Sequence, residues 1–151
     1  MNMFLAATTG LFSMALAGAA LAAPVAPAKA DPAVLAPLES YLEGHRTGSR
    51  EAFERAFHPQ AELFGIREGK VFRETAAQYA ARAGSGRASP DDAQRVRTIE
   101  SVEVTGGAGV AKIVLDYPTV RYTDYMSLLL VDGRWVIVNK TFMGEAKTAA
   151  K

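Results

Sequence analysis

Residues 122–142 read Tyr122-Thr-Asp-Tyr-Met-Ser-Leu-Leu-Leu-Val-Asp-Gly-Arg-Trp-Val-Ile-Val-Asn-Lys-Thr-Phe142, and this stretch decides the fold. Two long apolar runs flank Asp132-Gly133. An Asp-Gly pair between such runs is the strongest short-range signal for a two-residue β-hairpin turn. The stretch therefore predicts two long antiparallel strands, the first ending at Val131 and the second beginning at Arg134.

Counting outward from this turn predicts which side chains share a face of the hairpin. Opposed residues on antiparallel strands project to the same side, and the side alternates along each strand. One predicted face carries Trp135 together with Asp124, Met126, Leu128, Leu130, Ile137, Asn139 and Thr141. The other predicted face carries Tyr125, Ser127, Leu129, Val131, Val136, Val138 and Lys140. Both faces are mostly apolar, so we expect both to be covered.

The bulk composition is that of one ordinary globular domain. The chain has 151 residues, of which 49% are hydrophobic and 22% charged, and this length suffices for one well-packed core. A formal net charge of +1 provides no field to attract nucleic acid or an anionic membrane, which disfavours both as partners. The absence of cysteine excludes disulfides, thiolate metal sites and a cysteine nucleophile.

The first residues are typical of an export signal. Met1 to Ala23 carry no charged side chain, and Ala20-Leu21-Ala22 fits the small-x-small pattern of a cleavage site. We therefore predict a signal peptide at residues 1–22 and a linker at 23–31, which makes the mature protein periplasmic or secreted from a bacterial cell. The alternative is a retained transmembrane anchor, because an apolar stretch of about 19 residues can just span a bilayer.

Three helix starts are legible in the rest of the chain. Asp31-Pro32 offers an N-cap followed by a first-turn proline, Ser49 offers a second cap, and Thr75-Ala-Ala-Gln78 forms a capping box. Because Pro37 has no backbone N–H to donate, the regular part of the first helix is expected to begin only there.

Apolar patterning and turn residues predict six strands, at 62–67, 70–73, 96–105, 109–117, 120–131 and 134–142. Helices and strands are largely segregated, which indicates an α+β fold with three N-terminal helices packed on one face of a curved, mainly antiparallel sheet. The domain is expected to cover residues 32–145, with a disordered tail at 146–151.

This order of elements is similar to the nuclear transport factor 2-like superfamily, whose fold is a cone-shaped α+β barrel. Three parts of the sequence resemble one branch of it, the putative lumazine-binding or SnoaL-like group of bacterial proteins. They are Tyr41-Leu-Glu-Gly44 with Thr47-Gly48, then Ala56-Phe-His-Pro-Gln-Ala61, and then Thr123-Asp-Tyr-Met-Ser-Leu128 with Asp132-Gly-Arg-Trp135 and Ile137-Val-Asn-Lys140. The resemblance runs across nearly all of residues 34–143.

The resemblance implies a pocket inside the cone and a dimer formed through the sheet. Superfamily members such as ketosteroid isomerases, scytalone dehydratases and polyketide cyclases use an acid or a histidine that lines the cone. The apolar second face of the hairpin suits a sheet-to-sheet contact. We therefore expect a homodimer through Tyr125, Leu129, Val136 and Val138.

Asp124 with Asn139 is the leading candidate pair for chemistry. The predicted register puts both on the Trp135 face, which would point into the cone. An apolar cavity disfavours the charged form of a carboxylate, and this prepares it to act as a general acid or base. Asn139 would then orient Asp124 or bind a substrate oxygen. The structural alternative is that Asp124 accepts hydrogen bonds from the backbone or from Thr141 near a strand end.

Histidines supply the second set of candidates. A neutral His58 beside Asp124 could act as a base, because imidazole exchanges protons near neutral pH. A histidine at a helix end also commonly caps the last carbonyls, and this alternative applies to His58 and to His45. With two histidines, no cysteine and no carboxylate at ligand spacing, neither a metal site nor another cofactor is predicted.

Three aromatic residues complete the predicted ligand-binding set. Tyr41 and Tyr79 lie on predicted helices, and either hydroxyl could polarise a substrate carbonyl. The alternative for both is a core tyrosine with its hydroxyl at the rim. Trp135 is expected to be either part of the core or a platform for the ligand.

Two functions fit these residues. The first is an exported domain that binds a small apolar or aromatic molecule in the cone. The second is a proton-transfer enzyme of the isomerase, dehydratase or cyclase type, with Asp124 as general base. The enzyme requires an open cavity in which polar groups converge, whereas the binding domain requires no paired acid and base.

Overall fold

The computed structural model of the chain describes residues 31–148. The predicted signal peptide, the predicted linker except Asp31, and residues 149–151 lie outside this range. The elements are α1 (Pro32–Thr47), α2 (Arg50–Ala56), β1 (Phe57–Arg67), β2 (Lys70–Thr75), α3 (Ala76–Ala83), a short 3-10 helix (Asp92–Gln94), β3 (Val96–Thr105), β4 (Ala108–Asp116), β5 (Val120–Val131) and β6 (Arg134–Ala146). Within the described range, no helix has the length and apolar character needed to cross a bilayer.

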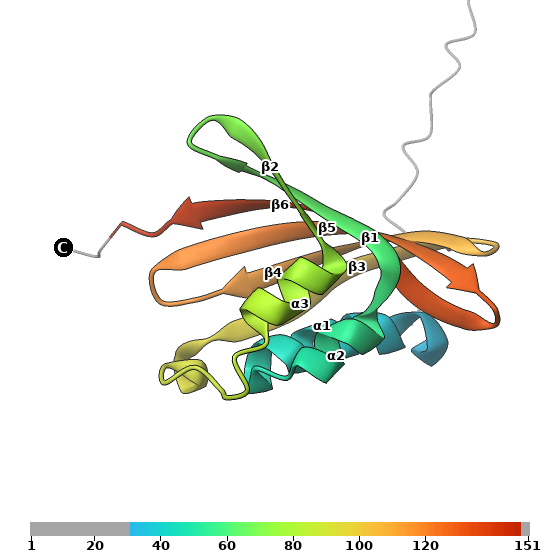
Figure 1. Ribbon diagram of the computed structural model, residues 1–151, viewed down its shortest axis with the longest axis horizontal. Helices are drawn as coiled ribbons and strands as arrows, with labels where there is room; N and C mark the ends of the chain where they lie inside the picture. The colour runs from blue at the N-terminus through green and yellow to red at the C-terminus, as the bar shows by residue number, and fades with distance from the viewer. Residues whose placement is uncertain (1–30, 149–151) are drawn as a thin grey trace, which may run out of the picture.

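The strands form a six-stranded sheet in the order β2-β1-β6-β5-β4-β3. Neighbouring strands are antiparallel except β1 and β6, which run parallel. Figure 1 shows the three helices against one side of the sheet, with the β1–β2 hairpin bending away from the other strands. The predicted α+β class, with three helices on a curved and mainly antiparallel sheet, is therefore confirmed.

The helices begin where their capping residues predict. Asp31, Ser49 and Thr75 each accept a hydrogen bond from a backbone N–H in the first helical turn, and Thr75 forms the full capping box with Gln78. These side chains satisfy N–H groups that have no partner inside the helix.

Two predicted boundaries are wrong. The first helix is regular from Pro32, and Pro37 lies inside it, because the buried face that carries Val34, Leu38 and Tyr41 runs through the proline and holds both sides of it. The first strand begins at Phe57 instead of residue 62, so His58 lies in a strand and caps no helix.

The ordered chain also extends beyond the predicted domain end at residue 145. Strand β6 continues to Ala146, and the backbone N–H of Lys147 donates to the carbonyl of Thr119 at 2.9 Å. The Lys147 ammonium pairs with Asp116, with Nζ and Oδ1 2.5 Å apart.

The hairpin register follows the prediction near the turn and departs from it further along. Leu130 pairs with Trp135, and Leu128 pairs with Ile137, as counting outward from Asp132-Gly133 predicts. The next pair is Ser127 with Asn139, so Val138 is an extra residue in β6. Such a β-bulge places two residues of one strand opposite one residue of its partner.

The bulge exchanges the faces of all β6 side chains beyond it, because side chains alternate with a period of two. Asp124 pairs with Phe142 instead of Thr141, and Lys140 pairs with Met126 on the concave side of the sheet. The prediction that Lys140 lies on the opposite face from Asp124 is therefore wrong. The prediction that Asn139 shares the face of Asp124 is wrong for the same reason.

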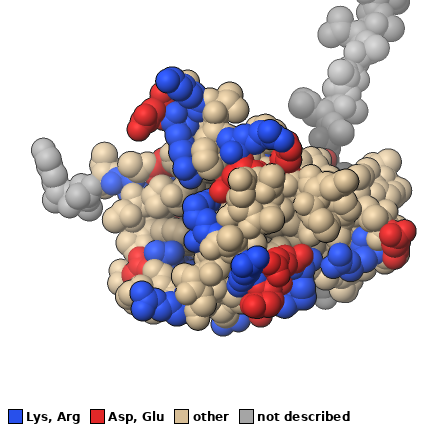
Figure 2. All heavy atoms as spheres, in the orientation of Figure 1, with Lys and Arg blue, Asp and Glu red and all other residues tan. Residues whose placement is uncertain are grey.

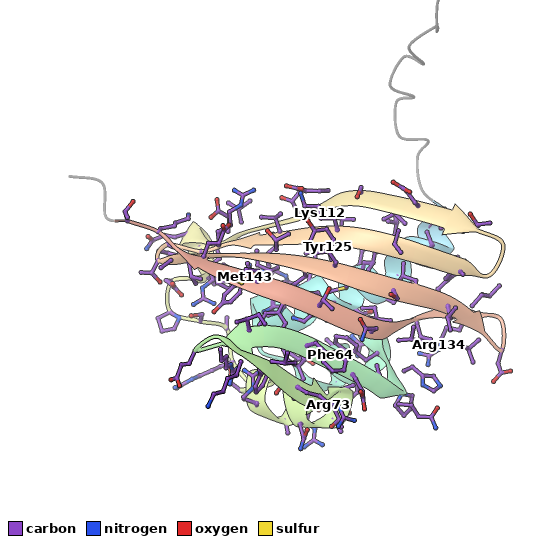
Figure 3. The ribbon with its side chains drawn as sticks, turned by 90° about the horizontal axis from the view of Figure 1, so that it is seen from above. Phe64, Arg73, Lys112, Tyr125, Arg134 and Met143 are labelled. Atoms are coloured by element: carbon purple, nitrogen blue, oxygen red, sulfur yellow. The ribbon has the colours of Figure 1, made fainter. Side chains whose placement is uncertain are left out.

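The opposite, outer face of the sheet carries exposed apolar side chains. Tyr125 and Leu129 are 56% and 41% exposed, and Val138 is half-buried. Val136 is 1% exposed, because it is enclosed within this chain, so it is unavailable to a second subunit. Figure 3 views this face, with Lys112, Tyr125 and Met143 labelled across β4, β5 and β6.

Gly44 allows Phe53 of α2 to pack closely against α1. A Cβ on Gly44 would lie 2.6 Å from the Phe53 ring. Phe53 is fully buried and contacts the rings of Tyr41, His45 and Tyr79. The ring therefore has no free space into which it could retreat.

We expect Gly44→Ala to lower the free energy of unfolding by about 1–3 kcal/mol, because the added methyl overpacks a filled core. Denaturant unfolding followed by circular dichroism measures the change. Gly107→Ala is the matched control, because its Cβ would meet Leu130 at 3.6 Å, an ordinary contact distance. An equal loss in both variants would contradict this account.

Candidate functional site

A pocket of about 210 Å³ lies between α1, α3 and the concave face of the sheet. Its wall includes four tyrosines, two arginines and one histidine, together with Asp124 and Lys140. This volume is smaller than the about 300–1,000 Å³ that is typical of ligand pockets, and the wall carries more polar groups than the mostly apolar lining of such pockets.

A buried charge pair lies in the wall of this pocket. Asp124 and Lys140 are 1% and 4% exposed, and Lys140 Nζ lies 3.5 Å from Asp124 Oδ1. Tyr41 bridges the pair: its hydroxyl donates to Asp124 Oδ2 at 2.6 Å and accepts from Lys140 Nζ at 2.9 Å. Removing charges from water is costly, and these hydrogen bonds offset part of that cost.

Aromatic rings enclose the Lys140 ammonium. Its nitrogen lies 5.1, 4.8 and 4.6 Å from the ring centroids of Tyr41, Tyr79 and Phe142. A cation within about 6 Å of a ring face is attracted by the ring quadrupole. Burial lowers the pKa of Lys140, and the nearby Asp124 charge opposes this shift.

A chain of hydrogen bonds leads away from Asp124 along the pocket wall. The Tyr79 hydroxyl donates to the Tyr41 hydroxyl at 3.3 Å and lies 2.7 Å from His45 Nε2. On the other side of the imidazole, the Tyr117 hydroxyl lies 3.1 Å from His45 Nδ1. These contacts join five side chains in one line.

Each donor in this hydrogen-bond network donates in the direction of Asp124. The single Tyr41 proton goes to Asp124, and the single Tyr79 proton goes to Tyr41. Tyr79 must then accept from Nε2–H of His45, which leaves Nδ1 to accept from Tyr117. We assign the Nε2–H tautomer to His45 on this ground.

Burial and surrounding charges shift the pKa values of these groups. Burial, followed by the positive charges of Lys140, Arg97 and Arg95, lowers the pKa of His45 well below its usual range. Burial raises the pKa of Tyr41 and of Tyr79 well above the tyrosine value. The histidine and both tyrosines are therefore neutral at physiological pH, as the donor directions require.

Basic side chains gather at the mouth of the pocket. Arg67 and Arg82 belong to its lining, and Figure 2 shows basic side chains extending from the β1–β2 hairpin toward α3 on the face in view. Arg82 pairs with the buried Glu74 at 2.5 Å. Arg67 stacks over the Phe72 ring, 3.6 Å from its centroid, and makes no ion pair within the described range.

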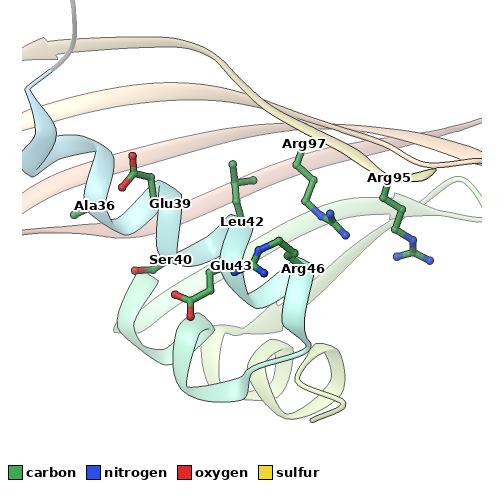
Figure 4. Close-up of a pocket in the computed structure, with 8 residues that line it drawn as sticks. All are labelled: Ala36, Glu39, Ser40, Leu42, Glu43, Arg46, Arg95 and Arg97. Atoms are coloured by element: carbon green, nitrogen blue, oxygen red, sulfur yellow. The ribbon is translucent and has the colours of Figure 1, made fainter. Parts of the chain in front are cut away.

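A second, more open hollow of about 740 Å³ runs along the outer side of α1. Figure 4 shows Arg95 and Arg97 at one end of it and the acidic Glu39 and Glu43 on the helix. Arg97 reaches the helix end, where it donates to the backbone carbonyl of His45 at 3.1 Å. The basic end of this groove therefore lies directly behind His45.

The structure brings together only some of the predicted site residues. Asp124, Tyr41 and Tyr79 line one pocket, as predicted. Asn139 instead lines a hollow on the outer face and donates to the backbone carbonyl of Glu62 at 3.1 Å. The bulge at Val138 is the physical reason.

His58 and Trp135 also lie outside the pocket. His58 accepts a hydrogen bond from the backbone N–H of Gln60 and lines a separate hollow beside the hairpin turn. His58 lies there because it belongs to the start of β1 and not to a helix end. The hollow beside His58 and the pocket of Asp124 are separate. Trp135 belongs to the buried core. The core placement of Trp135 agrees with the structural alternative, whereas His58 neither joins Asp124 nor caps a helix end.

Lys140, His45 and Tyr117 are functional candidates that sequence reasoning missed or ranked too low. The signal that could have found Lys140 is a lysine in an apolar strand whose hairpin partner carries an acid, Asp124. The predicted register without a bulge placed this lysine on the outer face instead. His45 lies one helical turn after Tyr41, which places both on one face. Within the described range, no group of three histidine or acidic side chains could hold a metal ion.

The lowered pKa of His45 predicts an acid-side loss of stability. Below about pH 6.5, His45 binds a proton in the unfolded chain but stays neutral in the native structure. The free energy of unfolding therefore falls with decreasing pH. The slope due to this group approaches about 1.4 kcal/mol per pH unit. Above that pH, the contribution is fully present and constant.

Denaturant unfolding between pH 5 and 7.5 tests this expectation. His45→Gln should flatten the pH profile relative to the wild type, whatever its absolute stability. His58→Gln, which removes a histidine outside the pocket, is the variant with which the His45→Gln profile is compared. A profile that stays unchanged in His45→Gln would contradict a native neutral imidazole.

Known proteins with the same fold were identified by structure and by sequence. An NTF-2-like protein of unknown function from Silicibacter pomeroyi DSS-3 is 27% identical, with a TM-score of 0.65 over 75% of this chain and 93% of that one. An NTF2-like protein of unknown function from Shewanella baltica OS155 is 25% identical, with a TM-score of 0.68 over 76% of this chain and 93% of that one.

A similarity to a named enzyme is weaker. Aldolase FrzH of Cladobotryum sp. is 24% identical over 112 residues, which cover 73% of this chain and 87% of the aldolase. The family model described as "Putative lumazine-binding" matches residues 29–143, far more than half of the chain. This protein therefore belongs to the putative lumazine-binding family and has the nuclear transport factor 2-like fold.

Proposed function

We propose that the pocket binds a small anionic carbonyl compound and that Asp124 transfers protons at the carbon next to the carbonyl. The observation that carries this proposal is the Asp124–Tyr41–Lys140 cluster, in which a carboxylate and an ammonium lie buried in the wall of a cavity. Charged groups desolvated inside a pocket are typical of sites that move protons.

The hydrogen bonds assign different roles to the two charged groups. The hydroxyls of Tyr41 and Tyr79 each donate their one proton within the network, to Asp124 and to Tyr41. The Lys140 ammonium has three N–H groups and contacts Tyr41 and Asp124. Lys140 is therefore the donor available to a ligand oxygen. Its charge would stabilise the negative charge that develops on a carbonyl oxygen when the neighbouring carbon loses a proton.

The balance of charge favours an anionic ligand. Arg67, Arg82 and Lys140 line the pocket, against one lining carboxylate, Asp124, and the Glu74 partner of Arg82. The net positive charge raises the local concentration of anions in a recessed site. An arginine at the mouth also suits a carboxylate, which it can hold with two parallel hydrogen bonds.

The similarity to an aldolase supports the same class of chemistry. An aldol reaction begins with the removal of a proton beside a carbonyl, which is the step assigned to Asp124. Isomerases, dehydratases and cyclases that act on carbonyl compounds share this step. A binding domain without catalysis would use the same pocket and leave the bound molecule unchanged.

Hydrogen exchange into the methyl group of pyruvate tests the proposal. In deuterated buffer, the wild-type protein should accelerate exchange, as followed by proton NMR, and Asp124→Asn should slow it by at least about 100-fold, the usual contribution of a general base. Asp132→Asn is the control, because Asp132 lies in the hairpin turn at φ 50°, a conformation that asparagine accepts.

The outcome separates the two functions. Equal exchange in wild type and Asp124→Asn would remove Asp124 from the reaction. Binding of pyruvate, measured by calorimetry, without any exchange would indicate a binding domain. If the protein shows no binding of pyruvate or 2-oxobutyrate and no exchange with either, the proposal of a carbonyl ligand is overturned.

We also propose that the outer face of the sheet pairs with a second copy of this chain. Val110 and Tyr125 are 54% and 56% exposed on neighbouring strands. Lys112, directly opposite Tyr125 on the neighbouring strand, forms an ion pair of 2.7 Å with Glu100, so both charge signs are present. A two-fold contact needs a self-complementary patch, which apolar side chains beside charges of both signs provide.

Sedimentation velocity tests the pairing. The wild type should sediment as a dimer, and Tyr125→Glu should shift it to a monomer, because each copy would bury an unpaired carboxylate. Val71→Glu is the control: Val71 is 72% exposed but lies on β2, away from this face. A monomeric wild type would overturn the proposal.

A further inference from the structure

Lys140 stands out among the lysines of the described chain by its surroundings. Its side chain is 5% exposed, whereas those of Lys112 and Lys147 are 37% and 40% exposed and form ion pairs at the surface. The Lys140 nitrogen borders a cavity, touches one carboxylate and one hydroxyl, and lies over three aromatic rings. A stabilising ion pair does not need a cavity beside it.

We propose that Lys140 Nζ is a nucleophile that forms an imine with the carbonyl group of the molecule bound in the pocket. This inference rests on the proposed function, because it requires a carbonyl compound to enter. It adds a covalent intermediate, which proton transfer by Asp124 alone would not need. Amines that form imines in proteins are lysines whose charged form is disfavoured by a desolvated or cationic setting.

The contacts of Lys140 provide a route to the neutral amine. Asp124 Oδ1, 3.5 Å from Nζ, can accept the ammonium proton when a ligand fills the cavity and excludes water. This transfer converts a buried ion pair into two neutral groups, so a low-dielectric setting favours it. Burial among the aromatic rings already lowers the pKa of Lys140.

The steps balance in atoms and charge. The Lys140 lone pair forms a C–N bond as the C=O π bond breaks, and one amine proton moves to the former carbonyl oxygen. Protonated Asp124 then gives its proton to that hydroxyl, the C–O bond breaks and water leaves. The products are a cationic imine, one water and the Asp124 carboxylate, so the total charge equals that of the starting pair.

The same arrangement suits the next step. A cationic imine withdraws electrons more strongly than a carbonyl, and the regenerated Asp124 carboxylate lies beside it to remove the adjacent proton. Tyr41 keeps that carboxylate in place through a 2.6 Å hydrogen bond. The product is an enamine, which can take up a proton elsewhere or add to a second carbonyl.

The lining of the pocket also limits the class of carbonyl compound. Arg67 has no acidic partner within the described range and lies at the mouth, so it can bind a carboxylate on the ligand. About 210 Å³ admits a compound of a few carbons or one small ring. A short 2-oxo acid meets both conditions, with its carbonyl at Lys140 and its carboxylate toward the arginines.

Reductive trapping on the wild-type protein tests the inference. Pyruvate with sodium cyanoborohydride should add one pyruvate, less one oxygen atom, to the intact mass, and peptide mapping should place it on Lys140. We expect the rate of labelling at Lys140 to exceed that at Lys147 at least about tenfold. Exposure alone predicts the reverse order, because Lys147 is the more exposed side chain.

Variants sharpen the result. Lys140→Arg keeps a cation but cannot form an imine, so the label should disappear, whereas Lys147→Arg should leave labelling at Lys140 unchanged. Because the rate comparison is made within the wild-type protein, it holds even if Lys140→Arg folds poorly. Competing 2-oxobutyrate should slow labelling by pyruvate at Lys140 and leave labelling at Lys147 unaffected.

The outcomes of the two proposals are distinguishable. Label on Lys112 and Lys147 but not on Lys140, with methyl exchange of pyruvate still dependent on Asp124, would overturn the imine and leave the proton-transfer function standing. Absence of pyruvate binding, of exchange and of Lys140 label together would overturn both. Label on Lys140 that 2-oxobutyrate does not reduce would indicate chance modification and overturn the imine as an intermediate.

Discussion

The contact between Lys140, Tyr41 and Asp124 is the interaction on which the rest of the pocket depends. It ties strands β5 and β6 to helix α1, and Tyr79 extends it to α3. Leaving one member of a buried charge pair without its partner typically costs about 3–5 kcal/mol. The hydrogen bonds from Tyr41 to both charges therefore help to fix α1 against the sheet, and the cavity lies beside these groups.

The bulge at Val138 makes this contact possible. In an unbulged hairpin, Lys140 would face the outer side of the sheet and Asn139 would face the pocket. One extra residue in β6 reverses this and brings an ammonium, instead of an amide, to the carboxylate. Bulges recur beside active sites because they re-aim a side chain without altering the order of strands.

Capping residues and turns predicted most of the fold, because each acts through contacts within a few residues of sequence. Asp31, Ser49, Thr75 and Asp132-Gly133 all mark the ends that the structure shows. The site was less predictable. Asp124 was recognised because an acid inside an apolar strand stands out, but Val138 is an ordinary strand residue and nothing local reveals that it bulges. The distant parallel pairing of β6 with β1, and the Asn139 bond to Glu62, belong to tertiary structure.

The two hollows on either side of His45 are linked through its charge state. Arg95 and Arg97 line the groove along α1, and their charges help to keep the imidazole neutral. A neutral ring keeps one nitrogen as an acceptor, so Tyr117 donates to it and the donors point from Tyr117 to Asp124. A protonated ring would donate from both nitrogens and oblige Tyr117 to turn its proton away. The arginines outside the pocket thus help to maintain a hydrogen-bond network that ends on the Asp124 carboxylate. Because the tyrosine protons are used within this network, Lys140 is the group whose N–H groups could be donated to the proposed ligand.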